Sequence, residues 1–574
     1  MPPEPNLPAP QTSQNKVEVL KQAKDALAVW SDIFRYAQAD VPPLDDANAA
    51  SFLATGGLPE HLTSAARHAA IPDDDYVRMR WFGIYQQLHN NGYHMFRIRI
   101  PNGLLTPPQL REIAALAQQY ARGFVDITTR QCLQFHWLTL EAITGILPRL
   151  EKVNLVSTFA CGDTPRNVIG CPLTGLLPDE ITDASNAIQT VNRLFLDNPS
   201  EFSNLPRKFK AAIAGCPLHC HQPHINDLGI FGVLRQNPTT GQNQRGYGLM
   251  VGGGLAAQPH IAQSLRIFFT EDQLPAIARG VALIFRDSGY REKRNHARLK
   301  FLVADWGWQK FRDALEQKIG FTLDHDDSIT GTTHALPTDH LGSGPQKQPG
   351  LSYLGLPVEC GRLTADQLLT IATLAEKYAG QNAQIRLSNK QNLLFVNIPT
   401  ANLEPLAKAL TAAGLNPHAS LWRQSLVTCT GAQFCNLALT ETKTRAAQIL
   451  RFLEEHCPID SPIFLAITGC PNACAHYQIA DIGLTGVLCN FHGTPRTQAF
   501  NIFLGGSLNT PPKFATLALR KVPADFVHKA IQQLITAYHS HRLTPTETFR
   551  QFLARHPLAQ LTQWLTLPEM AQVQ

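Results

Sequence analysis

The chain contains nearly the same sequence twice. "IAGCPLHCHQPHINDLGIFGV" begins at Ile213, and "ITGCPNACAHYQIADIGLTGV" begins at Ile467. Two copies of one pattern of Cys, Pro, Gly and apolar residues restrict the fold strongly, because both copies must form similar local structure. The sequence therefore predicts an internal duplication.

A second pair of segments extends this duplication. "FRIRIPNGLLTPPQLREIAALAQQYARGFVDITTRQCLQFHWL" from Phe96 corresponds to "GLPVECGRLTADQLLTIATLAEKYAGQNAQIRLSNKQNLLFVNI" from Gly355. Both segments are typical of a strand, a loop, a helix and a strand, and both helices open with a Thr-x-x-Gln capping signal, at Thr106 and Thr364. Apolar residues then recur at helical spacing: Leu110, Ile113 and Tyr120 in one helix, and Leu368, Ile371 and Tyr378 in the other. We expect two copies of one α+β design, related by an approximate two-fold axis.

The composition limits the classes of function. With 574 residues, 44% hydrophobic and 17% charged, the chain can bury several cores. The net charge of +5 is small and no long Lys/Arg run occurs, so we expect no nucleic-acid partner, whereas an acidic protein could dock on a modestly basic face. An evenly solvated surface is the alternative interpretation of this charge. The start "MPPEPNLPAPQTSQNK" does not resemble a signal peptide, and no apolar run approaches the roughly 20 residues of a membrane span. We therefore expect a cytoplasmic protein with no membrane partner.

Cysteine spacing in the second copy indicates a metal centre. The chain has 12 cysteines, which in a reducing compartment more often bind metal or react than form disulfides. "TCTGAQFC" gives Cys429 and Cys435 as Cys-x5-Cys, and "GCPNAC" gives Cys470 and Cys474 as Cys-x3-Cys. Two close pairs of soft thiolates suit a [4Fe-4S] cluster. Zinc is the nearest alternative, although its structural pairs more often show Cys-x2-Cys, and buried unligated cysteines are the other.

Basic residues collect in the first copy. They are Arg97 and Arg99 in "MFRIRIP", Arg130 in "TTRQ", Arg166 in "TPRNV", and Lys208 and Lys210 in "LPRKFK". Residues two apart in a strand share a face, so each of the close pairs is expected to point one way. A solvated face explains any one pair equally well. Their collection in one half, opposite the cysteine half, predicts an anion site where the two copies meet.

These motifs together resemble a known family. "LPRKFK", "HINDLG", "RIRIPNG", "TRQ", the Cys-x5-Cys spacing and "TGCPNAC…QIADIGLTG" are similar to the sirohaem and [4Fe-4S] family of assimilatory sulfite and nitrite reductases, over about residues 76 to 545. "FRDSGYREKRNHARLKFLVADWGWQKFR" and "ACGDTPR" resemble its ferredoxin-dependent branch most. The implied fold is α+β, with duplicated ferredoxin-like "parachute" half-domains and two α/β domains that hold sirohaem and the [4Fe-4S] cluster. The boundaries that we predict are an N-terminal arm at 1–75, half-domains at 76–145 and 351–415, α/β domains at 146–332 and 416–574, and a Gly/Pro/His-rich linker at 333–350.

The resemblance also implies roles residue by residue. The cluster ligands of the family match Cys429, Cys435, Cys470 and Cys474, and the last of these also matches the thiolate that bridges to the sirohaem iron. The residues that face the substrate match Arg99, Arg166, Lys208 and Lys210. Arg130 matches an Arg that neutralises sirohaem carboxylates, and Asn226 lies in a motif that lines the haem pocket. The activity implied is ferredoxin-dependent reduction of sulfite to sulfide by six electrons. Electrons must come from outside, because the sequence shows no Gly-rich dinucleotide fingerprint and no flavin module.

Other functions stay open at this point. Reduction of nitrite to ammonia with the same cofactors is the main alternative, and the family's Lys-x-Lys pattern, here Lys208 and Lys210, favours sulfite. A precorrin-type monooxygenase, which shares the ancestry and the cluster, is more distant. A non-enzymatic zinc or cluster-binding module is the least favoured, because it leaves the basic residues unexplained.

The first copy poses a question of its own. Cys216 and Cys220 repeat the Cys-x3-Cys spacing, but the upstream pair, Cys161 and Cys171, is Cys-x9-Cys. We therefore interpret the repeated segment that begins at Ile213 as the relic of a cluster site. The alternative is a second cluster on these four cysteines. In some relatives a Cys at the position of Cys161 is covalently joined to a Tyr, for which Tyr85 is the candidate here, and we favour an ordinary buried Cys161.

Overall fold

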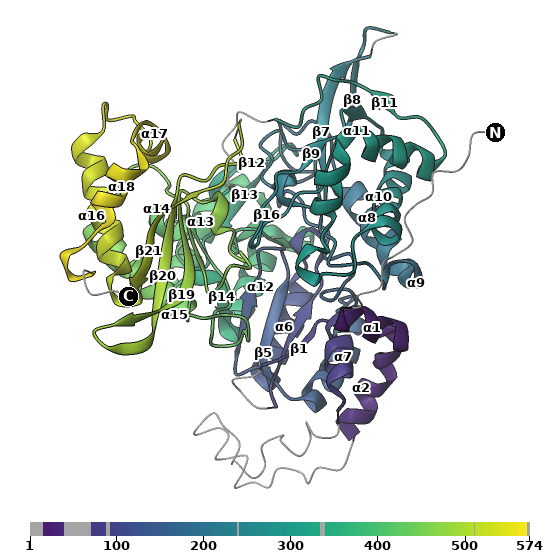
Figure 1. Ribbon diagram of the computed structural model, residues 1–574, viewed down its shortest axis with the longest axis horizontal. Helices are drawn as coiled ribbons and strands as arrows, with labels where there is room; N and C mark the ends of the chain where they lie inside the picture. Colours follow the sequence, from purple (N-terminus) through teal and green to yellow (C-terminus); the bar gives the residue numbers. More distant parts are fainter. Residues whose placement is uncertain are drawn as a thin grey trace.

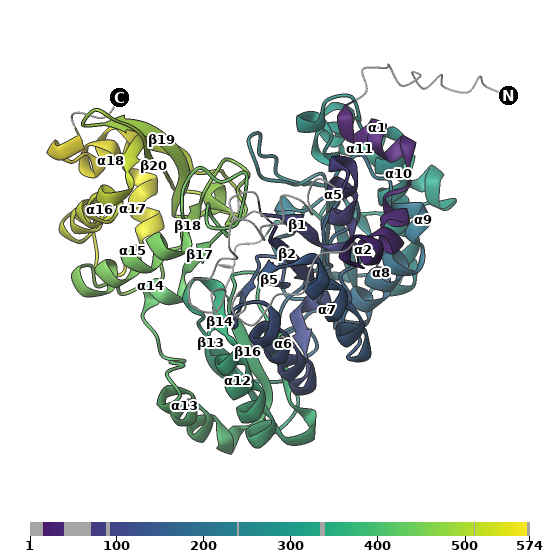
Figure 2. The ribbon, with the colours of Figure 1, turned by 90° about the horizontal axis from the view of Figure 1, so that it is seen from below.

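The computed structural model describes residues 15–38, 71–87, 92–237, 240–332, 339–509 and 511–570. Two α/β parts lie on either side of a central unit built from both copies (Figures 1 and 2). The predicted α+β class and the duplication are confirmed. Within the described ranges, no helix combines the length and the apolar character needed to cross a membrane.

The central unit consists of two five-stranded antiparallel sheets. The first contains, in order, β1 (Ile84–Gln86), β2 (His94–Ile98), β5 (Leu133–Leu138), β4 (Phe124–Ile127) and β14 (Arg362–Thr364); the second contains β12 (Gly342–Pro345), β13 (Leu351–Leu356), β16 (Leu393–Pro399), β15 (Gln384–Leu387) and β3 (Leu104–Leu105). The fifth strand of each sheet comes from the other copy: Leu363 pairs with Val125, and Leu105 pairs with Ile385. Neither sheet is complete without the other copy, so the two half-domains form one interlocked unit.

One helix of each copy packs in this unit, α6 (Pro107–Tyr120) beside α12 (Ala365–Ala379) (Figure 2). Both predicted capping boxes are present, since Thr106 and Thr364 exchange hydrogen bonds with the Gln three residues later. The apolar positions Leu110, Ile113, Leu368 and Ile371 are buried, and the two tyrosines are half-buried. Arg111 of α6 forms an ion pair with Glu376 of α12 at 2.5 Å, which joins the two copies at the surface. The helices α7 (Leu140–Lys152) and α13 (Leu403–Ala412) complete the unit.

Each α/β part contains one mixed sheet. The sheet of the first part consists of β6 (Ala211–Ala214), β7 (Leu228–Gln236), β8 (Asn243–Val251) and β9 (Gln263–Ser264), and its main helices are α8 (Ser185–Asp197), α10 (Leu274–Ser288) and α11 (Leu299–Ile319). The sheet of the second part consists of β17 (Leu426–Thr428), β18 (Leu465–Thr468), β19 (Ile482–Phe491), β20 (Thr494–Leu504) and β21 (Thr516–Pro523). Its main helices are α15 (Lys443–His456), α16 (Val527–His541), α17 (Phe549–Arg555) and α18 (Leu558–Leu565). The two repeated segments, from Ile213 and from Ile467, begin in β6 and β18, which run parallel to β7 and β19. Each segment then forms a Cys-containing loop, a 3-10 turn and the next strand. The two copies thus fold alike.

The N-terminal segment supplies the helices α1 (Lys16–Ala23), α2 (Val29–Gln38) and α5 (Asp73–Met79). α2 packs against α7, and α1 lies against the first α/β part (Figure 1). Residues 1–14 and 39–70 of the predicted arm and 333–338 of the predicted linker lie outside the described residues. The rest of the linker contributes β12, which pairs with β13. The domain boundaries stay a prediction.

Candidate active site

The cysteines of the second copy lie at the carboxyl ends of two adjacent parallel strands. Cys429 follows β17, and Cys470 and Cys474 are in the loop after β18. Neighbouring parallel strands end at the same sheet edge, and the loop that carries Cys435 returns to that edge, where Leu439 N donates to the Gly469 carbonyl at 2.7 Å. The structure therefore brings the predicted cluster ligands to one place.

Electrostatics link these four sulfur atoms. Burial, together with the negative charge of Cys474, raises the pKa of Cys429 to about 12. Burial likewise raises the pKa of Cys435 and of Cys470, again with a contribution from Cys474. Thiols that resist ionisation on their own become thiolates only when a cation binds them. The set is thus suited to hold metal.

The spacing of the set distinguishes a cluster from a single ion. Over the described residues, the one group of His, Cys, Asp or Glu whose ligand atoms all lie within 4.8 Å of one another is elsewhere in the chain. The second-copy sulfurs are therefore spread more widely than the ligands of one ion. This wider spacing favours the predicted iron-sulfur cluster over the zinc alternative.

Two of the predicted substrate residues are arginines held by neutral partners. Arg99 is fully buried, and its Nε donates to Asn192 Oδ1 at 2.9 Å while Nη1 donates to the Pro165 carbonyl at 2.9 Å. Arg166 donates from Nη2 to the Gly162 carbonyl at 2.6 Å. Backbone carbonyls and an amide fix the direction of each guanidinium without neutralising its charge.

The two predicted lysines lie in the extended segment that leads into β6. Phe209 between them is fully buried and forms a bridge with Pro165, so Lys208 and Lys210 share the opposite face as predicted. The Lys210 amide donates to Asp227 Oδ2 at 2.8 Å, and Asp227 is itself neutralised by Arg298 at 2.8 Å. Asp227, in the "HINDLG" motif, therefore positions the lysine backbone.

The pKa shifts show how closely these cations are confined. Burial, together with the positive charges of Arg298 and Arg207, lowers the pKa of Lys208 to about 7, and the negative charge of Cys474 opposes this shift. Burial and Arg130 also lower the pKa of Lys210 well below its usual range. The Lys208 ammonium and the second-copy thiolate thus interact across the junction between the copies.

A carboxylate counter-ion is missing from this basic set. Within the described ranges, no Asp or Glu forms an ion pair with any of the residues Arg99, Arg130, Arg166, Lys208 and Lys210. Confined cations without a partner need an anion from outside the chain, because an uncompensated buried charge is costly. The arrangement is suited to bind an oxyanion and a cofactor that carries carboxylates.

Arg130 and Asn226, the residues predicted to hold a haem, contact each other. Arg130 Nη1 donates to Asn226 Oδ1 at 2.9 Å, and Nη2 donates to the Ala211 carbonyl at 3.0 Å. Burial lowers the pKa of Arg130 to about 9. Its Nε atom is buried and finds no hydrogen-bond acceptor among the described residues. An unsatisfied guanidinium edge at this position fits the acidic side chains of sirohaem.

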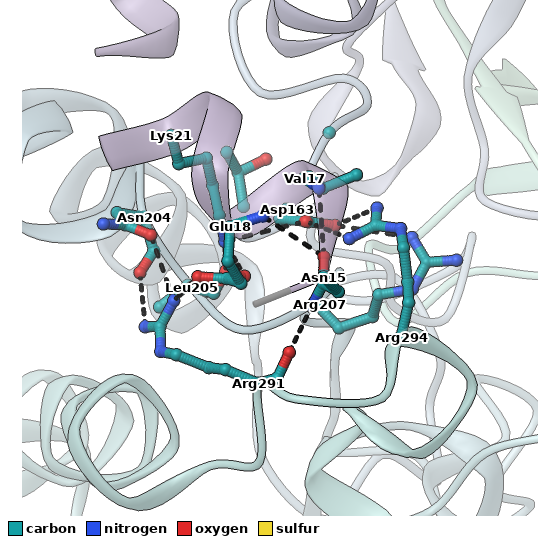
Figure 3. A network of polar contacts seen from close by, with 12 residues as sticks. Asn15, Val17, Glu18, Lys21, Asp163, Asn204, Leu205, Arg207, Arg291 and Arg294 are labelled. Carbon is teal, nitrogen blue, oxygen red and sulfur yellow. Dashed lines mark hydrogen bonds and ion pairs between the residues drawn. The ribbon is translucent and has the colours of Figure 1, made fainter. Parts of the chain in front are cut away.

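A buried carboxylate that the sequence did not reveal holds the loop of Arg166 in place (Figure 3). Asp163, in "CGDTPR", is fully buried and accepts hydrogen bonds from Arg294 at 2.7 and 3.0 Å. Arg207 donates to it at 3.4 Å, and Lys21 of α1 lies 3.8 Å away while donating to the Leu205 carbonyl at 2.8 Å. The N-terminal helix therefore anchors both segments that carry Arg166 and Lys208. Nothing in the local pattern around Asp163 distinguishes it from an exposed turn residue.

Cys161 lies apart from the other first-copy cysteines. Arg97 Nη1 donates to the Cys161 sulfur at 2.9 Å. The pKa of Tyr85 is raised mainly by burial and secondly by the negative charge of Cys161. Tyr85 and Cys161 are thus neighbours, as their candidate pairing requires. The compact ligand group of this copy contains Cys171, Cys216 and Cys220 but not Cys161. The alternative of a second cluster on Cys161 and these three cysteines stays a prediction, and the compact group of the structure has His340 in place of Cys161.

Two models of known protein families match this chain. The family model described as "Nitrite and sulphite reductase 4Fe-4S domain" matches residues 161–323 and 423–569, and that described as "Nitrite/Sulfite reductase ferredoxin-like half domain" matches residues 85–153 and 344–413. The chain belongs to the nitrite and sulfite reductase family. Enzymes of this family are oxidoreductases that contain a [4Fe-4S] cluster and typically sirohaem, so the predicted family, enzyme class and cofactors are confirmed.

Relatives of this reductase carry names of both activities. An assimilatory ferredoxin-dependent nitrite reductase of Haloferax mediterranei is 35% identical over 84% of this chain and 86% of its own. A sulfite reductase [ferredoxin] of Mycobacterium tuberculosis is 35% identical over 83% of this chain and 88% of its own. The solved structure of the M. tuberculosis NirA protein superimposes with a TM-score of 0.83 at 32% identity, over 96% of this chain and 97% of that one.

Proposed function

We propose that this reductase converts sulfite to sulfide with six electrons supplied by a ferredoxin, at a sirohaem coupled to the [4Fe-4S] cluster. The observation that carries the proposal is the set of confined cations that form no ion pair with a carboxylate of the described residues, one of which, Lys208, interacts electrostatically with Cys474 across the junction of the copies. Relatives named as ferredoxin-dependent sulfite and nitrite reductases support the reaction class.

The chain provides separate residues for each cofactor. Cys429, Cys435, Cys470 and Cys474 are proposed to ligate the cluster, with the exposed Cys474 shared with sirohaem. Arg130 and Asn226 are proposed to bind the sirohaem periphery, since burial and an unsatisfied guanidinium edge fit its carboxylates. When bound, the two cofactors supply single electrons to the central atom of the substrate.

The basic residues bind the oxyanion and supply protons. Arg99 and Arg166 are fixed by carbonyl and amide oxygens, so their charge is already oriented before an anion arrives. Lys208 has a pKa of about 7, which suits a group that donates a proton from Nζ near neutral pH and regains it. Each oxygen of the substrate needs protons to leave as water, and Lys208 is the proposed donor.

The second ammonium is the basis for choosing sulfite. Sulfite carries up to two negative charges and nitrite one, so Lys210 beside Lys208 favours the more highly charged anion, especially where water is excluded. Reduction of nitrite to ammonia is the second candidate, because relatives named as nitrite reductases match the chain equally well.

The ferredoxin is proposed to dock beside Cys435. The loop after this residue exposes two apolar side chains, Leu437 with 66% and Leu439 with 44% of its surface accessible. Exposed apolar side chains that gather on a surface mark protein contacts, and docking there would give electrons a short path to the proposed cluster.

The test compares kcat/KM for sulfite and nitrite in the wild type and in Lys210→Asn, with exposed Lys408→Asn as the matched control. We expect a sulfite preference in the wild type and the control, and a shift of about tenfold or more toward nitrite in Lys210→Asn. A wild type that strongly prefers nitrite, with no shift on substitution, would contradict the choice of substrate.

A further inference from the structure

The first copy contains a compact group of metal-ligand side chains that the proposed reaction does not use. Cys171, Cys216, Cys220 and His340 are all buried, and their ligand atoms lie within 4.8 Å of one another. It is the sole group of its kind in the part of the chain that the structure describes. Three sulfur atoms and an imidazole nitrogen rarely converge in a core without a ligand in common.

Three of these residues occupy the positions of cluster ligands in the second copy. Ile169 pairs in parallel with Ala212, as Val427 pairs with Ala466. The strands of Ala212 and Ala466 each lead into one of the two repeated segments. Cys171 follows Ile169 at the same distance as Cys429 follows Val427. By the same alignment Cys216 and Cys220 match Cys470 and Cys474. The first copy has therefore kept three ligand positions, and His340 takes the place of a fourth.

The size of the group identifies what it can hold. A tetrahedral ion about 2.3 Å from sulfur and about 2.0–2.1 Å from nitrogen sets its ligand atoms roughly 3.5–3.8 Å apart. Cys171 Sγ lies 3.3 Å from His340 Nε2, and no ligand pair of the group exceeds 4.8 Å. The second-copy cysteines do not meet this limit. The first-copy group is thus sized for one ion.

Backbone amides support two of the thiolates. Leu173 N donates to Cys171 Sγ and Leu218 N donates to Cys216 Sγ, each at 3.4 Å. Such N–H···S bonds favour the ionised sulfur that a metal requires. Two of the three sulfur atoms therefore already accept a backbone hydrogen bond, as metal-bound thiolates commonly do.

The histidine is delivered by a segment that is fixed in place. Asp339 next to it is buried and accepts hydrogen bonds from Ser388 Oγ at 2.9 Å and Asn392 Nδ2 at 2.6 Å. His340 has a φ of 55°, so its backbone adopts the left-handed conformation that a non-glycine residue takes only where its surroundings demand it. The segment before β12 thereby holds the imidazole against the cysteines, with His340 Nε2 3.3 Å from Cys171 Sγ.

We propose that Cys171, Cys216, Cys220 and His340 bind one structural Zn²⁺ ion. Four protein ligands fill a tetrahedral shell and leave no open position, which is the arrangement of a structural site. The ion joins the loop after β6 to the start of the second half of the chain, and β6 itself follows directly after Lys208 and Lys210. Binding releases the protons of the thiols and oxidises nothing.

The first experiment measures metals in the intact holoenzyme purified after growth with added zinc. We expect about one zinc per chain beside the iron of the haem and the [4Fe-4S] cluster. Zinc-edge X-ray absorption should show three sulfur ligands at about 2.3 Å and one nitrogen at about 2.0–2.1 Å. Absence of zinc, about eight non-haem irons with matching sulfide, or a disulfide within the group would each overturn the proposal.

Variants locate the zinc. His340→Ala should lose zinc to a chelator at least tenfold faster than the wild type, His340→Cys should retain it, and exposed His418→Ala serves as the control. Retention of zinc by His340→Ala at the wild-type rate would overturn the proposal. If that variant does not fold, the zinc-edge X-ray absorption spectrum of the wild type decides the proposal. Sulfite and nitrite turnover of the same wild-type sample tests the proposed function separately, because the zinc result does not depend on it.

Discussion

Thr129 Oγ1 donates a hydrogen bond of 3.0 Å to the backbone carbonyl of Cys474. Thr129 belongs to the first copy, directly before Arg130, and Cys474 is the last cysteine of the second-copy set. This bond therefore joins the segment that is proposed to bind the haem periphery to the backbone of the cysteine that is proposed to be shared by haem and cluster. The duplication places one half of the site in each copy.

Replacing the shared thiolate should remove both cofactors. We expect Cys474→Ser to lose the cluster and the haem bands together, because one sulfur is proposed to serve both metals. The buried cysteines Cys457 and Cys489 are matched controls, and Cys457→Ser and Cys489→Ser should keep a nearly unchanged spectrum. Iron, acid-labile sulfide and the absorption spectrum are the measurements. Equal losses in all three variants would refute the ligand assignment.

Arg130 should affect haem binding and leave the cluster in place. A hydrogen bond to a charged group contributes about 1.5–3 kcal/mol, so Arg130→Gln should weaken sirohaem binding roughly 10- to 100-fold. Non-haem iron and sulfide should stay at wild-type levels. Arg122→Gln, at an exposed residue stacked on Trp137, is the control. Full haem occupancy and wild-type affinity in Arg130→Gln would exclude the proposed role.

The low pKa of Lys208 predicts a pH dependence of anion binding. Its ammonium is charged below about pH 7 and neutral above it, so the KM for an anion should rise as the pH increases through that value. Nitrite keeps one charge throughout the range and is the suitable probe. Lys208→Arg retains its charge and should flatten the profile. The prediction fails if the wild type and Lys208→Arg show the same dependence of KM on pH.

The docking surface beside Cys435 can be tested with two donors. Leu437→Glu places a negative charge where an acidic ferredoxin is proposed to bind, so ferredoxin-driven turnover should fall about tenfold or more. Turnover with reduced methyl viologen should not change. Leu234→Glu, at an exposed leucine of β7, is the control for a general effect of the substitution. Equal ferredoxin-driven rates in Leu437→Glu and Leu234→Glu would place the docking surface elsewhere.

Strong local patterns predicted much of this fold. The capping signals at Thr106 and Thr364 both form, because the hydrogen bonds of a helix N-terminus depend only on residues within one turn. The exchange of β3 and β14 was not predicted. These strands have two and three residues, too few for a periodic pattern, and their partners are distant in sequence.

The same distinction holds for the sites. Cysteine pairs close in sequence predicted the cluster ligands of the second copy, since short loops must bring them together. His340 could not be recognised, because it lies in the predicted linker and only the tertiary fold brings it to Cys171. Asp163 was missed for a related reason: its partners Arg294 and Lys21 come from opposite ends of the first half.

The central claim is that one site at the junction of the two copies carries sulfite through six electrons to sulfide. The most direct test measures sulfide released against reduced methyl viologen consumed, a one-electron donor, in the wild type and in Cys474→Ser. We expect six viologens oxidised for each sulfide formed in the wild type and no sulfide from the variant. Viologen oxidation with sulfite that yields no sulfide, or a variant that still forms sulfide, would contradict the account.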